Sequence, residues 1–335
     1  MPLRILGHQD VRRFLPMREC IEAVEEAFRA LARGEAVNPL RRALRLPGGA
    51  GLLGWMPASL GEGKVFGIKA LSVFPGNRAA GLESHQGVVL LFEPENGRLL
   101  GILDASEITA IRTAAASGVA TRLLAREDAG VLALLGSGVQ ARTHLEAMAA
   151  VRPLGEVRIW SRGPDHAEAL ARAEGARRGI PVFAKASARE AVEAADLVCT
   201  VTGSPEPVLQ GDWLAPGCHV NAVGACIPAH RELDTRAVER ARLFVDSREA
   251  AGREAGDYLI PLQEGAVGED HVQGEIGELL LGRVEGRRDA SEITLFKSLG
   301  LAVQDLAAGR LVLERAEREG AGIVLDLGGL RHESA

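Results

Sequence analysis

The sequence lacks several features that would place it in other classes of protein. No run approaches about 18 consecutive apolar residues, so no transmembrane helix is predicted. Residues 1–10 show no basic start followed by an apolar stretch, so no signal peptide is expected. No basic stripe stands out and the formal net charge is -6, which argues against a nucleic-acid partner. We therefore expect a globular, cytoplasmic protein with no membrane association.

Cysteine is scarce, and the spacing of the cysteines indicates no particular kind of site. The four cysteines fit neither a CxxC pair nor the ligand spacing of a zinc site, so neither a disulfide framework nor a metal is expected. Reduced thiols are typical of the cytosol. No internal repeat and no low-complexity segment is present. The length of 335 residues exceeds what a single core of about 250–300 residues accommodates, which predicts two domains.

The N-terminal third has the pattern of a β-rich domain. Residues 17–33 place apolar side chains on one helical face, and Gly34 stands where a helix would end. A hairpin is predicted at Asn96-Gly97, a dipeptide that accepts the positive φ angles of a tight turn. Strand-like runs cover 43–46, 52–56, 65–73, 88–92 and 99–103. We predict a mainly antiparallel unit with one leading helix, followed by a helix of small residues over 106–124 that bridges the domains.

The remaining chain has a different periodicity. Apolar runs alternate with helical stretches, which is typical of βαβ units and a parallel sheet. The predicted strands are 131–135, 157–160, 197–201, 219–223 and 243–245. A helical pattern returns near 293–313, and 323–327 is short and strand-like. The predicted fold class is α/β, with a Rossmann-type doubly wound sheet and a mainly antiparallel β domain before it.

A glycine-rich turn follows the first strand of this second region. The residues are Gly136-Ser137-Gly138-Val139-Gln140-Ala141, the GxGxxA form of the dinucleotide fingerprint. Gly136 permits the tight turn, Gly138 lets the backbone approach a pyrophosphate, and Ala141 keeps the helix close to the strand. The N–H groups at the helix start are free for phosphate oxygens. We predict dinucleotide binding by this turn; the alternative is a glycine turn with no ligand.

The end of the second strand predicts which dinucleotide binds. NAD-specific sites carry an Asp or Glu there for the ribose 2′-OH. This chain instead has Ser161 followed by Arg162, and a guanidinium matches a 2′-phosphate in charge and geometry. The sequence therefore favours NADPH over NADH. The alternative is that Arg162 is a solvated loop residue, and Asp165 lies too far past the strand to be preferred.

Three basic residues of the first domain stand out by their context. Arg41 follows an Asn-Pro-Leu segment, Lys69 lies inside an apolar strand, and Arg112 lies in the helix of small residues. Basic side chains are rarely buried without a counter-charge. A substrate carboxylate would supply that charge. An internal acid such as Glu107, or side chains that reach water, would serve equally well on the pattern alone.

With these features, the sequence resembles the ornithine cyclodeaminase/mu-crystallin family over nearly its whole length. The matching stretches keep their order and spacing; they are 56–58, 84–86, 90–97, 109–115, 136–141, 221–225, 231–234, 245–247 and 294–300. The segment Ile159-Trp160-Ser161-Arg162 is similar to the mu-crystallin-like ketimine reductase branch, which uses NADPH.

The resemblance implies a homodimer and a division of labour between two domains. Residues 1–118 with 304–335 would bind substrate and dimerise, and residues 119–303 would form the NAD(P)-binding Rossmann domain. In the family, the positions that match Arg41, Lys69 and Arg112 hold the substrate carboxylate. The resemblance also assigns further cofactor contacts, namely Val223, Gly224, Asp246, Lys297 and Gly300.

One departure from the family pattern bears on the reaction. Cyclodeaminases and related alanine dehydrogenases have an Asp after the Ala-Val-Gly strand, where it handles proton transfers. Cys226 occupies that position here, and a thiol with an ordinary pKa near ~8.5 is a poor substitute for a carboxylate. His85 is a candidate proton source or orienting group; the alternative is a structural histidine. The predicted catalytic residues are Lys69, Arg112, His85 and Cys226.

These inferences predict an NADPH-dependent oxidoreductase. Its substrate would be a small, cyclic, carboxylate-bearing imino acid, and the reaction would be reduction of the C=N bond. Two other functions stay open. One is a cyclodeaminase acting on ornithine or lysine, or an alanine-type amino-acid dehydrogenase. The other, of a different class, is a non-catalytic ligand-binding protein of the mu-crystallin kind.

Overall fold

The computed structural model describes residues 2–327. The chain divides into two compact units, one made of Met1–Arg112 with Leu301–Ala335 and the other of Thr113–Gly300. The first boundary falls inside helix α3 (Ala105–Leu124). The sequence prediction set the boundaries at residues 118 and 304. The predicted fold class is confirmed, with one mainly antiparallel sheet and one parallel Rossmann-type sheet.

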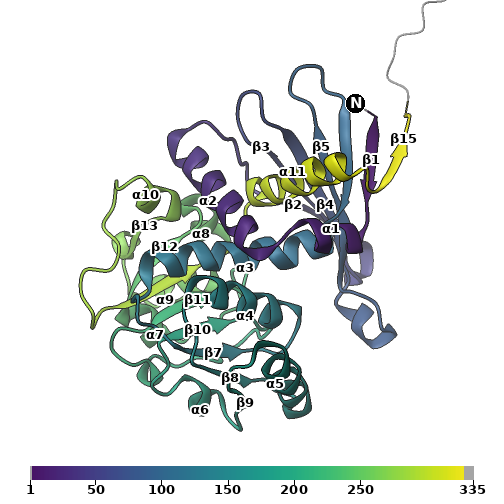
Figure 1. The fold of residues 1–335 in the computed structure, drawn as a ribbon. Helices are drawn as coiled ribbons and strands as arrows, with labels where there is room; N and C mark the ends of the chain where they lie inside the picture. The colour runs from purple at the N-terminus through teal and green to yellow at the C-terminus, as the bar shows by residue number, and fades with distance from the viewer. Residues whose placement is uncertain (1, 328–335) are drawn as a thin grey trace, which may run out of the picture. The chain divides into compact units, whose positions relative to one another are not determined.

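The first unit is built on a seven-stranded sheet in the order β15-β1-β6-β5-β4-β3-β2 (Figure 1). Every neighbouring pair is antiparallel except β1 and β6, which run parallel. The hairpin between β5 and β6 turns at Gly97, whose φ of 74° is the positive value that the sequence predicted. The strands are β1 (Leu3–Leu6), β2 (Arg42–Arg45), β3 (Leu52–Ser59), β4 (Phe66–Val73), β5 (His85–Phe92), β6 (Leu99–Asp104) and β15 (Ile323–Leu325).

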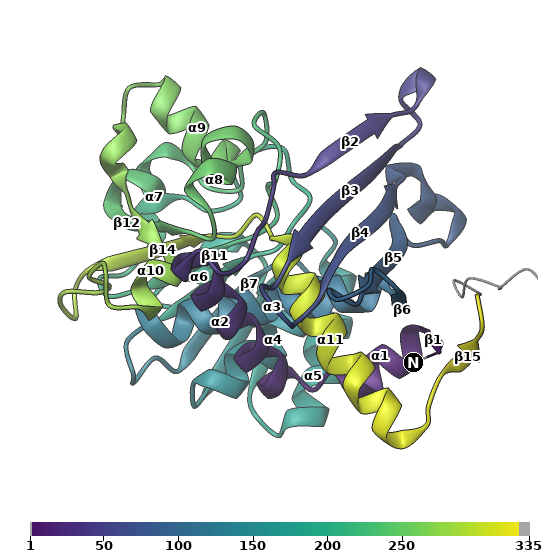
Figure 2. The same ribbon diagram turned by 90° about the horizontal axis from the view of Figure 1, so that it is seen from above.

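Helices cover one face of this sheet. The covering helix is α11 (Ala302–Glu319), which packs on β3, β4, β5 and α2 and is seen from above in Figure 2. Helix α2 (Met17–Arg33) ends at Gly34 with a φ of 74°, as predicted. A further helix, α1 (His8–Phe14), precedes it, so the unit has two leading helices rather than the one expected. Strand alternation points Met56, Lys69 and Val89 towards the covered face.

The second unit is an eight-stranded parallel sheet in the order β13-β12-β14-β11-β10-β7-β8-β9. Its strands are β7 (Val131–Leu135), β8 (Glu156–Trp160), β9 (Val182–Ala184), β10 (Leu197–Thr200), β11 (His219–Ala222), β12 (Ala241–Val245), β13 (Val272–Glu275) and β14 (Ile293–Lys297). Its helices are α4 (Val139–Val151), α5 (Pro164–Arg178), α6 (Ala188–Val192), α7 (Thr235–Arg240), α8 (Arg248–Glu254), α9 (Gly256–Gln263) and α10 (Ile276–Leu280). Short 3-10 turns lie at Pro47–Gly49, Pro75–Ala80, Gly211–Trp213 and Glu269–His271.

The strand order fixes where a ligand can bind on this sheet. The chain adds β8 and β9 on one side of β7 and then crosses to add β10, β11 and β14 on the other. The order therefore reverses between β7 and β10. In open α/β sheets, ligands bind at such a reversal, outside the carboxyl ends of the strands. The glycine turn follows β7 at that end.

One sequence prediction is wrong in this unit. The helical pattern expected near 293–313 begins only at Ala302, because residues 293–297 form strand β14. All five residues of β14 are buried between β11 and β12. A short strand buried on both faces shows no apolar/polar alternation, so periodicity alone does not distinguish it from a buried helix. Among the described residues, no helix is both long and apolar enough to cross a bilayer.

Candidate functional site

Two of the three predicted basic residues meet in the first unit, around a carboxylate that the sequence analysis missed. Lys69 stands in the middle of β4, between Met56 of β3 and Val89 of β5. Its Nζ lies 2.8 Å from one oxygen of Asp305 on α11. Arg112 of α3 places its Nε 2.8 Å from the other oxygen. Residues from a strand and two helices therefore converge on one point.

This cluster is buried and carries an unbalanced charge. Asp305 is 0% exposed, Lys69 3% and Arg112 4%. Two cations and one carboxylate leave a formal charge of +1. Arg112 also donates from Nη1 to the side-chain oxygen of Gln304 at 2.8 Å, so its direction is fixed. Burying net charge is costly, and a second anion would relieve that cost.

The third predicted cation, Arg41, contributes through its field. Burial lowers the pKa of Lys69 to about 8, with further lowering by the charges of Arg112 and Arg41, while Asp305 acts in the opposite direction. The segment before Arg41 is tied to α11, because the Asn38 side-chain oxygen accepts the Val303 N–H at 3.1 Å. Positive charge from strand β4, helix α3 and one loop is thus concentrated near Lys69.

Glu107, which the sequence analysis offered as an internal partner for these cations, has other partners. It is buried at 4% exposure, with its carboxylate 3.5 Å from His8 and 3.9 Å from Arg12. An internal acid does pair with these cations, but it is Asp305, the fourth residue of α11, and not Glu107. On a helix, Glu107 and Arg112 lie five positions apart and point in different directions.

His85 is not brought next to the basic cluster. It begins β5 and pairs with Val73, whereas Lys69 pairs with Val89 further along the same strand. Its side chain is exposed, and its Nδ1 lies 3.0 Å from the hydroxyl of Ser84. His85 therefore stays a prediction that rests on the sequence and not on its surroundings.

The glycine turn of the second unit has the geometry of a nucleotide cradle. Gly136 has a φ of 128°, and its N–H donates to the Trp160 carbonyl at 2.8 Å, which fixes the turn against β8. Gly138 caps α4, and a Cβ placed on it would meet nothing within 4 Å. Open space thus lies in front of the helix start, where the N–H groups of Val139 and Gln140 belong to the first turn.

Ser161 and Arg162 follow β8 directly, beside the glycine turn. The Ser161 hydroxyl donates to the Gly163 carbonyl at 2.7 Å, which shapes the loop. Arg162 is exposed, and the tip of β8 carries no carboxylate before Asp165. The side chain at the position that contacts the ribose 2′ substituent in Rossmann-type folds is therefore a guanidinium and not a carboxylate.

The segments assigned to the other half of the dinucleotide follow β11 and β14. Val223 and Gly224 come directly after β11, and the turn Lys297–Gly300 comes at the end of β14. Among the described residues, the hydroxyls of Thr200 and Ser298 are buried at this end of the sheet without a hydrogen-bond partner. Such orphaned groups fit a site that binds a polar ring substituent.

Three predicted residues in this region have structural partners. Asp246, 2% exposed, accepts the N–H groups of Leu299 and Gly300, each at 2.7 Å, and so holds the turn in place. The ammonium of Lys297 is 1% exposed and lies 2.9 Å from Asp257. Cys226 is half-buried, with its Sγ 3.5 Å from the Val223 carbonyl. In the 297–300 turn, the Ser298 hydroxyl is the group that is buried without a hydrogen-bond partner, and it stays available to a ligand.

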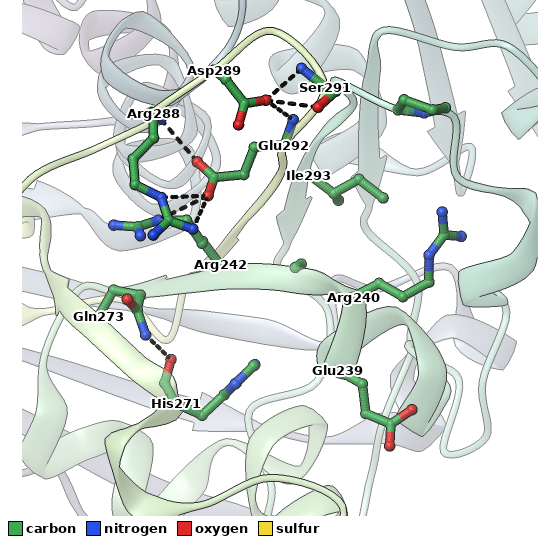
Figure 3. A pocket seen from close by; sticks show the side chains of 12 residues that line it. Glu239, Arg240, Arg242, His271, Gln273, Arg288, Asp289, Ser291, Glu292 and Ile293 are labelled. Atoms are coloured by element: carbon green, nitrogen blue, oxygen red, sulfur yellow. Dashed lines mark hydrogen bonds and ion pairs between the residues drawn. The ribbon is translucent and has the colours of Figure 1, made fainter.

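A surface hollow of about 550 Å³ lies at the opposite end of the same sheet (Figure 3). Its lining includes Ala241 and Ile293, the first residues of β12 and β14, whereas the glycine turn stands at the carboxyl end of the strands. Figure 3 shows Arg242 and Arg288 turned towards Glu292, with which both form ion pairs. We do not assign the hollow to the site.

Beside the predicted site residues, sequence reasoning missed three buried acids, Asp305, Glu232 and Asp257, of which Asp305 was the easiest to find. It stands in the stretch Leu301–Ala308, where every other residue except Gln304 is apolar, and a lone acid in such a helix asks for a cation. For Glu232 and Asp257 the sequence gives a weaker signal of burial and pairing. Glu232 is followed by Asp234 in a polar loop, and no spacing in the sequence relates Asp257 to Lys297.

Comparison with known proteins places these features in context. The model of the ornithine cyclodeaminase/mu-crystallin family matches residues 4–320. The mouse (Mus musculus) ketimine reductase mu-crystallin is 40% identical over 294 residues, covering 88% of this chain and 90% of the mouse protein. The Thermococcus litoralis Δ1-pyrroline-2-carboxylate reductase, solved with NADH and L-proline, is 38% identical with a TM-score of 0.93, covering 96% of this chain and all of the other.

A third relative has a different activity. An archaeal alanine dehydrogenase dimer solved with NAD is 35% identical, with a TM-score of 0.92, and covers 98% of this chain and 100% of its own. Similarity of this extent reaches both units of the chain, so the comparison is not confined to the common nucleotide-binding fold.

Proposed function

The chain belongs to the ornithine cyclodeaminase/mu-crystallin family, and on that premise we propose that it is an NADPH-dependent reductase of small cyclic imino acids. Two relatives carry imine-reducing names, the mouse ketimine reductase and the Thermococcus litoralis pyrroline-2-carboxylate reductase. The substrate would be a five- or six-membered ring with a carboxylate on the carbon of its C=N bond. The product would be the corresponding cyclic amino acid.

The observation that carries the proposal is the surplus positive charge at Lys69, Arg112 and Asp305. A buried group of formal charge +1 favours one further anion, and the substrate carboxylate supplies it. Asp305 and Gln304 take the Nε and Nη1 groups of Arg112 and so fix its direction, and Nη2 is the donor that a substrate carboxylate would meet. Holding the carboxylate orients the adjacent prochiral carbon, and positioning of this kind accounts for much of catalysis in cofactor enzymes.

The cofactor assignment rests on the second unit. The open space at Gly138, the first turn of α4 and the orphaned hydroxyls fit a bound dinucleotide. Arg162, with no acid before it, favours the 2′-phosphate of NADPH, although the two solved relatives were obtained with NADH and NAD. When bound, the nicotinamide supplies the hydride that reduces the imine carbon. The protein residues hold the phosphates, the ribose and the ring in place.

The choice of reductase over cyclodeaminase rests on Cys226. The thiol lies against the carbonyls of Val223, Ser298 and Leu299, at 3.5–4.0 Å. These neighbours are carbonyl oxygens, which only accept hydrogen bonds, so the thiol serves here as a donor. The protein thus lacks a carboxylate at the position where the family's deaminating members handle protons. All four cysteines are free, which suits the cytoplasm.

The direct test of the proposal is an assay of NADPH oxidation. We expect consumption of NADPH with pyrroline- and piperideine-2-carboxylate and none with the same rings lacking the carboxylate. Gly138→Ala is the matched control, because its φ of -86° and open surroundings let it fold as the wild type does. The added methyl group would occupy the approach of the pyrophosphate and weaken NADPH binding by at least about tenfold.

Three outcomes would overturn the proposal in different directions. Release of ammonia from ornithine or lysine with NAD would establish a cyclodeaminase. Oxidation of alanine with NAD would instead point to a dehydrogenase like the archaeal relative. Tight NADPH binding with no turnover on a panel of imines and amino acids would support a non-catalytic binding protein.

The preference for NADPH has its own test, replacement of Arg162 by alanine. We expect the affinity for NADPH to fall about tenfold while that for NADH stays unchanged, because only the 2′-phosphate meets the guanidinium. Titration by fluorescence of the reduced nucleotides measures both. Arg172→Ala, which removes an exposed arginine of α5, is the control. Equal binding of both nucleotides by the wild type would contradict the assignment.

We also propose that the chain forms a homodimer through the uncovered face of the first unit's sheet. That face carries large apolar side chains, among them Leu53 at 44% and Phe66 at 37% exposure, and Phe66 stacks on Phe92 at 5.4 Å. Exposed apolar area of this kind marks an interface. Light scattering should give twice the mass of one chain, and Leu53→Glu should halve it while Phe183→Glu on β9 does not. A single-chain mass for the wild type would refute the proposal.

A further inference from the structure

Three buried charged residues lie behind the segments that follow β10, β11 and β14. Glu232 is 0% exposed, Lys297 1% and Asp257 2%. Together they form a connected group, since Asp257 accepts the N–H groups of Glu232 and Leu233 at 2.7 and 3.0 Å and pairs with Lys297 at 2.9 Å. Among the described residues, the hydrogen bonds and ion pairs of these three side chains involve neither Lys69 and Arg112 nor the glycine turn.

Glu232 joins two neighbouring loops through its carboxylate. One oxygen accepts the N–H and the hydroxyl of Thr202, both at 2.6 Å, and the other accepts the N–H of Gly224 at 2.6 Å. Thr202 follows β10 and Gly224 follows β11. A Cβ on Gly224 would stand 2.0 Å from the Thr202 carbonyl oxygen and 2.6 Å from Glu232, so the two loops and the carboxylate are in close contact.

The hydrogen bonds around Glu232 indicate the ionisation state of its carboxyl group. All three donors point at its oxygens, and the Ser204 N–H donates to the Thr202 hydroxyl at 3.1 Å, which leaves the hydroxyl hydrogen for Glu232. A carboxylate that only accepts is the ionised form. Burial, with a smaller contribution from Asp257, raises the pKa of Glu232, while the bonds from Thr202 oppose that shift.

The charges of the group do not cancel. Glu232 and Asp257 contribute -2 and Lys297 contributes +1, which leaves -1 at the carboxyl ends of β10, β11 and β14. Asp246, with its carboxylate on the Leu299 and Gly300 N–H groups, adds a further negative charge at the same end. In a doubly wound sheet this is the half that receives the second mononucleotide, because the first lies over β7 and β8.

We propose that Glu232 is a positioning residue for the nicotinamide ring, and that its buried negative charge makes this unit bind the oxidised, cationic ring more tightly relative to the reduced, neutral one. The proposal rests on the dinucleotide site of the proposed function and goes beyond it, since it assigns a residue outside the predicted site. A fixed charge in a buried place acts on a nearby ligand charge with little screening. Glu232 thus favours the direction in which positive charge forms on the ring.

The experiment measures dissociation constants for NADP⁺ and NADPH with the full-length protein, without substrate. For Glu232→Gln we expect the ratio of the NADP⁺ constant to the NADPH constant to rise about tenfold. The matched control is Glu174→Gln, which neutralises another glutamate of this unit, 4% exposed and paired with Arg178 of the same helix α5. That control should leave the ratio at the wild-type value.

A second variant separates charge from shape. Glu232→Asp keeps the charge but is too short to reach both Thr202 and Gly224, so it should weaken both nucleotides and leave their ratio unchanged. Thermal unfolding of each variant without nucleotide reports on folding. If Glu232→Gln does not fold, Glu232→Asp alone decides. A change in its ratio of the NADP⁺ to the NADPH dissociation constant overturns the role of the charge, and an unchanged ratio supports it.

The results also distinguish this inference from the proposed function. Equal weakening of both nucleotides by Glu232→Gln, or no change, would refute the role of the charge while leaving imine reduction intact. A wild type that binds both nucleotides but reduces no imine would refute the function and leave the inference standing.

Discussion

Replacing Asp305 with asparagine is expected to lower the free energy of unfolding by about 3–5 kcal/mol at neutral pH, the usual cost of removing one partner from a buried ion group. The exchange keeps the size of the side chain, so packing on α11 is unchanged. It leaves Lys69 and Arg112, at 3% and 4% exposure, without the carboxylate that each contacts at 2.8 Å. Urea unfolding measures the loss.

The dependence of this loss on pH follows from Lys69. Its folded pKa of about 8 already lies below the ordinary value, because burial disfavours the ammonium. In Asp305→Asn that pKa falls further, so raising the pH removes the buried charge and the deficit relative to the wild type shrinks. Asp128→Asn is the control, since Asp128 is 80% exposed and its ion pair contributes at most about 1 kcal/mol. Equal stability of Asp305→Asn and the wild type at neutral pH would contradict the +1 charge assigned to the cluster.

The parts of the fold that the sequence predicts correctly are those that local chemistry determines. Helix α2 begins and ends at the predicted residues because its apolar stripe and its terminal glycine act within the segment itself. The Asn96-Gly97 turn and the glycine turn after β7 depend on backbone angles that few residues adopt. Each can be predicted without knowing what the rest of the chain does.

The parts that the sequence does not predict depend on residues far apart in the chain. Strand β1 pairs with β6 and β15, which stand about one hundred and three hundred residues away, and nothing within Leu3–Leu6 indicates either neighbour. Lys69 and Arg112 were recognised as cations that need an anion, but Asp305 lies in the last helix of the unit. Periodicity predicts that a charge is buried and leaves its partner undetermined.

In the cofactor-binding segments, too, the sequence does not predict which partner a single side chain contacts. The family resemblance assigned Lys297 to the cofactor, and the turn that it opens is at the expected end of the sheet. Its ammonium, however, is committed to Asp257 and the Ala222 carbonyl. A motif preserves the backbone position of a residue, whereas the direction of its side chain depends on neighbours that the motif does not contain.

Lys69 should bind the substrate carboxylate only while its amine is protonated, and this gives a pH dependence with a definite sign. Because its pKa is lowered to about 8, the ammonium is present at neutral pH and is lost as the pH rises through that value. The dissociation constant for a carboxylate should therefore be flat below pH 8 and rise above it. Pyrrole-2-carboxylate is a suitable probe, since its ring nitrogen does not titrate in this range.

Lys69→Met tests whether this residue is the source of the dependence. The variant retains Asp305 against Arg112, a balanced pair, so we expect it to fold. Its affinity for the probe should be about 10- to 100-fold lower at neutral pH, the loss of one charge-assisted hydrogen bond, and should not change through pH 8. Lys64→Met, in the loop before β4, should behave as the wild type. Isothermal titration across the pH series measures all three proteins, and a wild-type affinity that stays constant through pH 8 would remove Lys69 from the carboxylate site.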